Sequence, residues 1–287
     1  METHRAAKGG SMTMDVSHRG LTDAQVAALV DELAEAARTG ARIAPASRRH
    51  PAMTVSDSYE VQRLWRARRE AEGGRVAGFK IGLTSVAMQQ AFGLDEPDYG
   101  VIFEDQILAA GSTVRATAWN NARVEVELSF LLASALVPGQ GSGADGAFTA
   151  EDILAATACV VPSLEILDCH FVEDGMTVVD TISDNAALGA VVRGAEEFDP
   201  AAFDLSWIGA KLTINGAIVE TGVSGAVLGH PAASAAWMAN RFAERGEEIP
   251  AGSLLLSGSF TRPIPVSAGD AVIADYQGMG EVRVQFT

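Results

Sequence analysis

The feature that most constrains this chain is a short alternating segment, Arg123–Leu128, with the sequence Arg-Val-Glu-Val-Glu-Leu. Side chains on a β-strand alternate between its two faces, so Glu125 and Glu127 would share one face, roughly 7 Å apart at the backbone. Two carboxylates at that separation can bind one hard cation, whose charge offsets their mutual repulsion. The same alternation is typical of an antiparallel strand with one face in water. The segment alone leaves both interpretations open.

A third carboxylate interrupts a run that otherwise predicts a buried strand. Between Cys159 and Leu167, Glu165 stands among mainly apolar residues. A buried carboxylate needs a cation, a basic side chain or a dense set of hydrogen bonds. A salt bridge to a Lys or Arg would satisfy that need. Together with Glu125 and Glu127, however, Glu165 could complete a site for Mg²⁺ or Mn²⁺ that keeps positions for water and substrate.

The composition argues against several classes of protein. The 287 residues include 37 Asp and Glu against 21 Lys and Arg, which gives a formal charge of −16. Such a charge repels phosphate backbones and anionic lipids, so we expect no nucleic acid or membrane partner. No apolar run is long enough to span a bilayer and no secretion signal is evident, so we expect a cytoplasmic location. Cys159 and Cys169 have neither a zinc spacing nor a disulfide framework, and we expect two free thiols.

The pattern of the chain predicts an α+β protein. Residues 1–20 are polar and aperiodic, which indicates a leader or a disordered arm. Residues 21–75 predict a small helical N-terminal part, with a first helix that follows Thr22 and ends at Gly40, and a second over about 56–72. From 76 to 287, short β-branched and aliphatic runs separated by Gly, Pro, Asn and Asp predict a mixed, mostly β catalytic domain.

Local signals within this body predict individual elements. Asn215-Gly216 favours a tight hairpin over residues 210–221. His230-Pro231 is typical of a helix start, with Gly246 as the end. The Gly-rich segment 141–146 fits the spacing of a dinucleotide-binding turn, but its neighbours offer no group for a pyrophosphate, so we interpret it as a surface connection. The expected C-terminal strands are Leu254–Leu256, Ala271–Tyr276 and Val282–Phe286.

Three further polar groups stand in unusual settings. Lys80 interrupts an apolar strand, and it could snorkel to the surface or, near a cation, hold an anion or move a proton. The polar cluster Asp180–Asn185 could be a turn held by Asp and Asn side chains. The loop Gly258–Pro263 could bind an anion through backbone N–H groups and Arg262. No Gly-x-Ser-x-Gly motif for nucleophilic catalysis occurs.

Taken jointly, these segments resemble the fumarylacetoacetate hydrolase superfamily, in its branch of 2-keto-4-pentenoate hydratases and oxalocrotonate decarboxylases. The resemblance covers about residues 50–287 and implies the fold of that superfamily. The matching segments are Lys80–Thr84, Glu96–Gly100, Arg123–Glu127, Leu164-Glu165, Asp180–Asn185, Gly229–Pro231 and Gly258–Pro263.

The resemblance implies a role for each matching residue. Glu125, Glu127 and Glu165 stand where the family binds a divalent metal, for which we expect Mg²⁺, with Mn²⁺ as the alternative. Lys80 and Asp98 stand where the family has its acid/base and substrate-orienting groups. The residues for which we expect contacts to the substrate are Arg123, Asp184, Thr261 and Arg262.

The implied function is a metal-dependent hydratase that adds water to a 2-hydroxy-dienoate or 2-oxo-alkenoate in aromatic catabolism, with 2-oxohept-4-ene-1,7-dioate as the expected substrate. The loop from Cys169 to Val179 is shorter than in the dioate hydratases, which bears on the distal end of that substrate. The alternatives are a 2-oxo-3-enedioate decarboxylase and a non-catalytic acid-binding or scaffolding subunit. We also expect a homo-oligomer, with a complex with a pathway decarboxylase as a further possibility.

Overall fold

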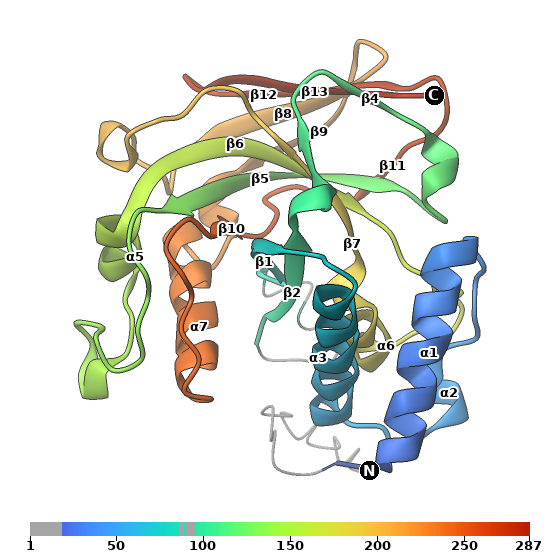
Figure 1. Cartoon of the computed structure of the whole chain (residues 1–287). Helices are drawn as coiled ribbons and strands as arrows, with labels where there is room; N and C mark the ends of the chain where they lie inside the picture. Colours follow the sequence, from blue (N-terminus) through green and yellow to red (C-terminus); the bar gives the residue numbers. More distant parts are fainter. Residues whose placement is uncertain (1–18, 86–88, 90–95) are drawn as a thin grey trace, which may run out of the picture.

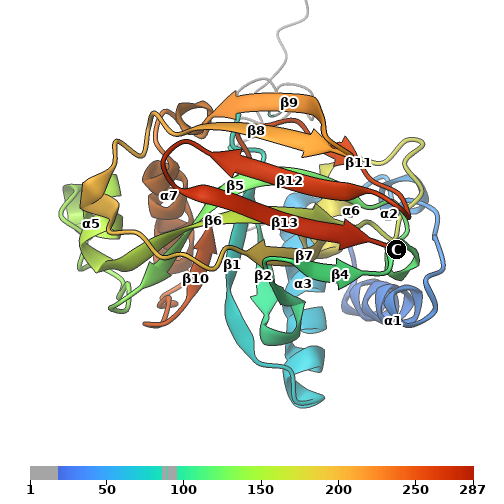
Figure 2. The same cartoon turned by 90° about the horizontal axis from the view of Figure 1, so that it is seen from above.

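Two packed β-sheets form the body of the protein, and helices lie along one side of it (Figures 1 and 2). The computed structural model describes residues 19–85, 89 and 96–287. In spatial order, the first sheet contains β2 (Asp98–Phe103), β1 (Val76–Gly82), β10 (Leu254–Leu256), β5 (Arg123–Leu132), β6 (Thr157–Leu167), β7 (Leu188–Arg193) and β3 (Ile107–Ala109), and β11 (Ile264–Pro265) also pairs with β5. The second sheet contains β4 (Ser112–Val114), β13 (Gly280–Phe286), β12 (Ala271–Tyr276), β8 (Gly209–Ile214) and β9 (Ala217–Val223).

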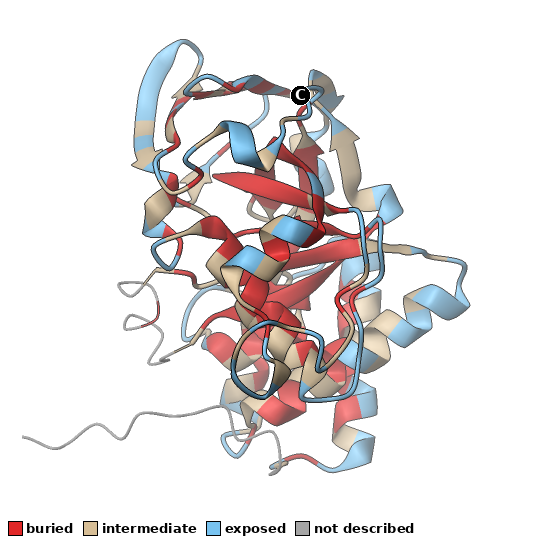
Figure 3. Ribbon diagram, turned by 90° about the vertical axis from the view of Figure 1, so that its left-hand side faces the viewer, coloured by how far each residue is buried: buried red, intermediate tan, exposed pale blue. Residues whose placement is uncertain are grey.

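The long antiparallel pair of β5 and β6 has one face in the core and the other directed away from it. On β5, Val124, Val126 and Leu128 are fully buried in the same apolar cluster as Val272 and Val284 of the second sheet. Because side chains alternate along a strand, the intervening glutamates of β5 must face the other way. Figure 3 shows the buried strands in the centre of the molecule. The alternating sequence of β5 therefore places its apolar side chains in the core and its glutamates on the opposite face.

The N-terminal part is helical, as the sequence predicts. It consists of α1 (Asp23–Thr39), α2 (Ala46–Arg49) and α3 (Val55–Ala71). The Thr22 hydroxyl accepts a hydrogen bond from the Gln25 backbone N–H at the start of α1, and Gly40 ends the helix with φ 70°. The helices bury an apolar cluster that also contains Phe171 of the body. The N-terminal part thus shares its core with the segment that follows β6.

In the described part of the body, the further α-helices are α5 (Ala150–Ala156), α6 (Val178–Ser183) and α7 (Pro231–Ala243). The hairpin of β8 and β9 turns at Asn215 and Gly216, with φ 52° and 81°, and α7 begins after His230, both as predicted. The Gly-rich segment is a surface connection that contains a short 3₁₀ turn over Ala144–Gly146.

Helix α6 differs from the turn that the polar cluster 180–185 could indicate. The Asp180 carboxylate accepts hydrogen bonds from the backbone N–H of Thr177 and from the backbone N–H and hydroxyl of Ser47. The aspartate therefore caps the start of a helix and fastens it to α2. Because Ser47 lies 133 residues away in the sequence, a local pattern could not reveal this partner.

Other predictions concern single features. Cys159 and Cys169 are both free thiols, as expected. Of the expected leader at residues 1–20, residues 1–18 lie outside the described residues. In the described part of the chain, no helix is long and apolar enough to cross a membrane.

Candidate active site

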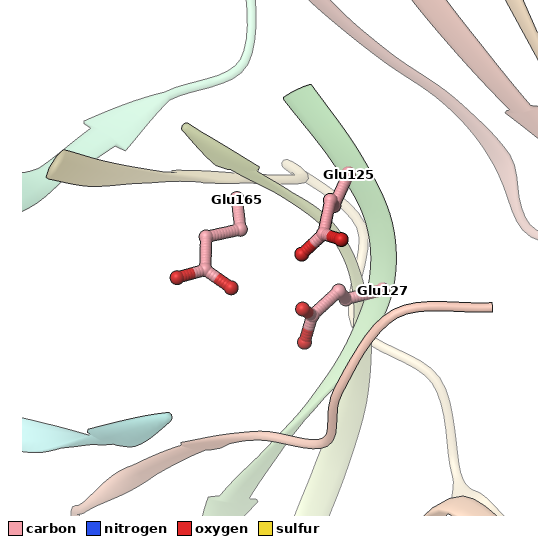
Figure 4. Close-up of side chains that lie close together, drawn as sticks. All are labelled: Glu125, Glu127 and Glu165. Atoms are coloured by element: carbon pink, nitrogen blue, oxygen red, sulfur yellow. The ribbon is translucent and has the colours of Figure 1, made fainter. Parts of the chain in front are cut away.

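Three glutamates come together on the face of β5 and β6 that points away from the two-sheet core. In the antiparallel register, Glu125 of β5 lies directly opposite Glu165 of β6, and Glu127 is the next residue on the same face of β5. One carboxylate oxygen of each lies within 4.8 Å of the others. Figure 4 shows the three side chains directed toward a common space. The structure thus brings together the residues that the sequence predicts as metal ligands.

Two of the three glutamates in this cluster are buried, and Glu125 is half-buried. Glu127 is fully buried and Glu165 is 1% exposed. Oε2 of Glu127 accepts a hydrogen bond of 2.7 Å from the backbone N–H of Gly258, but Oε1 of Glu127 has no hydrogen-bond partner among the described residues, and Oε1 of Glu165 has none there besides its ion pair with Lys80 at 3.3 Å. Buried polar atoms are rarely left without partners, and a bound cation is one of the few groups that would satisfy both.

Gly258, whose backbone N–H holds the Glu127 carboxylate, occupies a position that requires glycine. Gly258 has φ 99°, and a Cβ there would lie 2.5 Å from the side chain of Thr84. The loop is also fastened to β5, because the backbone N–H of Phe260 donates to the carbonyl of Val126 at 3.2 Å. The predicted anion-binding loop therefore positions a carboxylate of the cluster.

Proton affinities reflect the crowding of negative charge. Burial, followed by repulsion from Glu165, raises the pKa of Glu125 from 4.5 to about 8. The same two causes raise the pKa of Glu127 well above its ordinary value. A divalent cation would favour the charged forms, so protons and metal would compete for these oxygens.

Lys80 is a basic residue in direct contact with the cluster. It lies on β1, is 3% exposed, and its Nζ is 3.3 Å from Oε1 of Glu165. Burial alone would lower the lysine pKa, but the surrounding carboxylates, Glu165 first among them, raise it above the ordinary value. Lys80 therefore stays protonated. The salt bridge considered from the sequence exists, but one lysine does not balance three glutamates.

Asp98 is a further charged residue close to Lys80 and Glu165. It begins β2 and pairs with Gly82 of β1, where a Cβ would lie 2.2 Å from Oδ1 of Asp98. The glycine therefore leaves room for the carboxylate, whose Oδ1 has no hydrogen-bond partner among the described residues. Burial raises the pKa of Asp98 from 3.8 to about 6, against the lowering effect of Lys80. A carboxylate of this kind can accept and return a proton near neutral pH.

A cavity of about 720 Å³ opens beside these groups. Lys80, Asp98 and Glu125 line it, as do the predicted substrate contacts Arg123, Thr261 and Arg262. The other lining side chains with charge or hydrogen-bonding groups include Arg42, Thr84, Asn121, Asp168, Glu173 and Glu220. Glu173 belongs to the loop Cys169–Val179, which the resemblance implied to lie near the site, whereas Arg42, Asn121, Asp168 and Glu220 were not predicted from the sequence.

Two of the predicted substrate contacts already have charged partners. Arg123 Nη2 lies 2.8 Å from Oε1 of Glu173, and Arg262 Nε lies 2.7 Å from Oε2 of Glu220. Arg262 remains 79% exposed. The Thr261 hydroxyl accepts a hydrogen bond of 3.1 Å from the backbone N–H of Val126, which aligns the loop with β5.

Asp184 is not among the residues that line the cavity. Its Oδ2 accepts a hydrogen bond of 2.6 Å from the His170 backbone N–H, and its Oδ1 lies 2.9 Å from Nδ1 of the same residue. Burial would lower the pKa of His170, but the hydrogen bond to Asp184 raises it. Asp184 holds the segment after β6, and its contact to substrate stays a prediction.

Comparisons with known proteins identify relatives that match most of the chain. The chain is 40% identical over 264 residues to 2-oxo-hept-4-ene-1,7-dioate hydratase of Escherichia coli, covering 90% of this chain and 96% of the relative. It is 37% identical over 257 residues to 2-hydroxyhexa-2,4-dienoate hydratase of Comamonas testosteroni, covering 89% and 95%. A solved structure of 4-oxalocrotonate decarboxylase from Pseudomonas putida G7, complexed with magnesium and adipate, has a TM-score of 0.88 at 33% identity, covering 94% of this chain and 100% of that one. No family model matches the chain.

A curled mixed sheet carries a cluster of glutamates on the face that points away from the two-sheet core, and the relatives identify the class of protein that combines these features. The chain belongs to the fumarylacetoacetate hydrolase superfamily. Within the superfamily it belongs with the hydratases and decarboxylases of 2-oxo acids, as the sequence resemblance implied.

Proposed function

We propose that the protein is a divalent-metal-dependent hydratase, a lyase that adds water to a 2-hydroxy-dienoate or 2-oxo-alkenoate in aromatic catabolism, with 2-oxohept-4-ene-1,7-dioate as its substrate. The observation that carries this proposal is the cluster of Glu125, Glu127 and Glu165, with oxygens within 4.8 Å of one another beside a cavity. The hydratase relative with 40% identity supports the choice of reaction and substrate.

The donor set fits a hard cation. All three residues offer carboxylates, which suit Mg²⁺ or Mn²⁺ better than softer metals, and the buried Oε1 of Glu127 has no hydrogen-bond partner among the described residues. When bound, such a cation supplies Lewis acidity that stabilises enolate charge on the 2-oxygen of the substrate. The magnesium complex of the decarboxylase with 33% identity supports this assignment.

Proton transfer falls to Asp98 and Lys80. Asp98, with a pKa of about 6, is mostly deprotonated at neutral pH and can take a proton from substrate or water. Lys80 keeps its proton, so it is suited to hold the substrate carboxylate or to donate to the developing carbanion. Asp98 and Lys80 line the same cavity, so Asp98 can take a proton from one part of the substrate while Lys80 donates one to another part.

Arg123, Thr261 and Arg262 are proposed to contact the substrate from the wall of the cavity. Each of the two arginines is paired with a glutamate, so each would have to exchange that partner for a substrate carboxylate. The contact proposed for Asp184 would require His170 to release it. A homo-oligomer, a complex with a pathway decarboxylase, a cytoplasmic location and the division into parts at residues 20 and 75 stay predictions from the sequence.

The reaction is tested by product analysis. The enzyme is incubated with Mg²⁺ and a panel of 2-hydroxy-dienoates and dioates, and the products are followed by NMR and by CO₂ release. Accumulation of a 4-hydroxy-2-oxo acid supports the hydratase. Release of CO₂ as the main product would favour the alternative, a 2-oxo-3-enedioate decarboxylase. The TM-score of 0.88 to a 4-oxalocrotonate decarboxylase supports that alternative. Metal-dependent turnover by the isolated chain rules out a non-catalytic scaffolding subunit.

A further inference from the structure

The wall of the cavity carries three arginines, and they differ in how their charge is used. Arg123 contacts Glu173, and Arg262 contacts Glu220. Both glutamates also line the cavity, so each pair adds no net charge to it. The third arginine, Arg42, comes from the segment between α1 and α2.

Arg42 has no such neutralising partner. Its Nη2 donates a hydrogen bond of 3.2 Å to the carbonyl oxygen of Phe171. In the described part of the chain, no carboxylate lies within 4.0 Å of its guanidinium nitrogens. A guanidinium carries five N–H donors in a planar fork, so a single carbonyl leaves most of them available to a ligand.

The backbone around Arg42 is fixed against the body. Ile43 forms a parallel bridge with Phe171, in which the Ile43 N–H donates to the carbonyl of His170 and the Val172 N–H donates to the carbonyl of Ile43, both at 2.9 Å. The backbone next to Arg42 is therefore held on both sides of the Phe171 carbonyl that the exposed arginine side chain contacts. A fixed donor loses less entropy on binding a ligand than one on a mobile loop.

The path of the chain orders the cavity from the metal ligands to Arg42. Beyond Glu165, β6 ends at Leu167, and Asp168 and Cys169 continue the lining before Phe171 meets Arg42. A substrate held at its 2-oxo acid end by the carboxylate cluster would extend along this wall. Along this wall Glu173 and Glu220 are paired with arginines, but Asp168 has no arginine partner among the described residues, so a second substrate carboxylate would be repelled unless a free cation receives it.

We propose that Arg42 receives the distal carboxylate of a dicarboxylic substrate and makes the enzyme selective for dioates over the matching monoacids. This inference rests on the proposed function, because it assumes that the 2-oxo acid end binds at the glutamates. The relatives include hydratases named for a dioate and for a 2-hydroxyhexa-2,4-dienoate, and these two substrates differ in the group at the far end.

The test compares two substrates in three proteins. Steady-state kinetics with Mg²⁺ are measured on 2-oxohept-4-ene-1,7-dioate and on 2-oxohept-4-enoate, which lacks the distal carboxylate, for the wild type, Arg42→Ala and Arg42→Lys. Loss of one charge-assisted contact corresponds to about 10- to 100-fold in affinity. We expect Arg42→Ala to raise KM for the dioate by that factor, with kcat and the monoacid KM within twofold of the wild type. Arg42→Lys keeps the charge but not the fork, so an intermediate KM is expected.

A matched control is Arg38→Ala, which removes the same charge from the exposed end of α1, where Arg38 pairs with Glu35. It should leave both substrates unchanged. An equal change on dioate and monoacid in Arg42→Ala, or no change on the dioate, would overturn the proposal. Circular dichroism and Tm of each variant identify a folding defect, and Arg42→Gln then replaces Arg42→Ala.

Binding separates this proposal from the proposed reaction. Calorimetry with the unreactive acids heptanedioate and heptanoate in the presence of Mg²⁺ needs no turnover. The subsite predicts tighter binding of the diacid in the wild type and loss of that preference in Arg42→Ala. If the wild type converts neither oxo acid but shows this pattern, the hydratase assignment fails and the subsite stands. If the wild type shows no preference for the diacid, the subsite fails whatever the reaction is.

Discussion

Glu125 and Glu165 lie directly opposite each other in the antiparallel pair of β5 and β6, with carboxylate oxygens within 4.8 Å. Opposite positions on neighbouring strands are where like charges are most destabilising. Here the repulsion is increased by burial and by Glu127 on the same face. Such an arrangement is stable at neutral pH only with protons or a cation between the oxygens, and it is therefore the physical basis of metal dependence.

The first prediction concerns pH and metal together. The folded pKa of Glu125 is about 8 against an ordinary value of 4.5, so its contribution to stability is fully present below about 4.5 and lost as pH rises through about 8. The metal-free protein should thus become less stable over this range, and the gain in Tm on adding Mg²⁺ should grow. Thermal unfolding with EDTA or with Mg²⁺ at several pH values checks this. A gain in Tm that does not depend on pH would contradict it.

The second prediction concerns the buried lysine. Lys80→Met should destabilise the metal-free protein by about 3–5 kcal/mol, because the carboxylates of Glu165 and its neighbours lose their buried cation. Mg²⁺ should restore much of this stability, since it supplies the missing charge. Denaturant unfolding with and without Mg²⁺ measures both effects, and Lys211→Met, at an exposed pair with Asp275, is the control. Equal destabilisation by the two substitutions would argue against the cluster.

The same variant separates two roles for Lys80 at saturating Mg²⁺. If the lysine only binds the substrate carboxylate in the ground state, KM rises and kcat is retained. If it donates a proton in the rate-limiting step, kcat falls by about 10²–10⁴. The raised pKa of the lysine leads us to expect an effect on KM at least as large as that on kcat.

The third prediction concerns Asp98 as the base. A base works when deprotonated, so kcat should rise with pH through about 6, or through a lower value if a bound cation favours the charged form. Asp98→Asn should lower kcat by about 10²–10⁴ and remove this acidic limb from the pH profile. A limb that persists unchanged in Asp98→Asn would assign it to another group.

The fourth prediction concerns Asp184. Its carboxylate contacts His170 and does not line the cavity. Asp184→Ala should lower the free energy of unfolding by about 1–3 kcal/mol, because a buried backbone N–H and a ring nitrogen lose their acceptor. KM should change little. Denaturant unfolding and steady-state kinetics distinguish the two roles, and a large rise in KM without loss of stability would restore the role predicted from sequence.

The sequence predicts local features of this protein well. The alternation around Glu125 identifies β5 and its two faces, and the isolated Glu165 identifies a buried strand with a carboxylate that needs a partner. What the pattern cannot provide is the register of the two strands. That register depends on pairing across about forty residues, and a slip by one residue would turn Glu165 to the other face. The resemblance to the superfamily, more than the pattern, supplied Asp98.

The features that were missed depend on contacts between distant segments. Arg42 meets Phe171 across 129 residues, and an arginine at the end of a helical region has no local signal for a cavity. In the sequence, helix α6 is visible only as a polar cluster. The partner that explains its capping residue Asp180 is Ser47, which lies 133 residues away. The roles of Arg123 and Arg262 are visible as charge, but their glutamate partners come from other elements.

The measurement that tests the central claim most directly is Mn²⁺ binding, followed by EPR, in the wild type and in Glu127→Gln. The amide keeps the hydrogen bond from Gly258 and removes the ligand charge, so the fold should be preserved. We expect one Mn²⁺ per wild-type chain, none in Glu127→Gln under the same conditions, and a loss of activity of about a thousandfold or more. Glu281→Gln, on the exposed β13 pair with Arg283, should behave as wild type. A Glu127→Gln protein that binds Mn²⁺ as tightly as the wild type and keeps full activity would show that Glu127 is not a metal ligand.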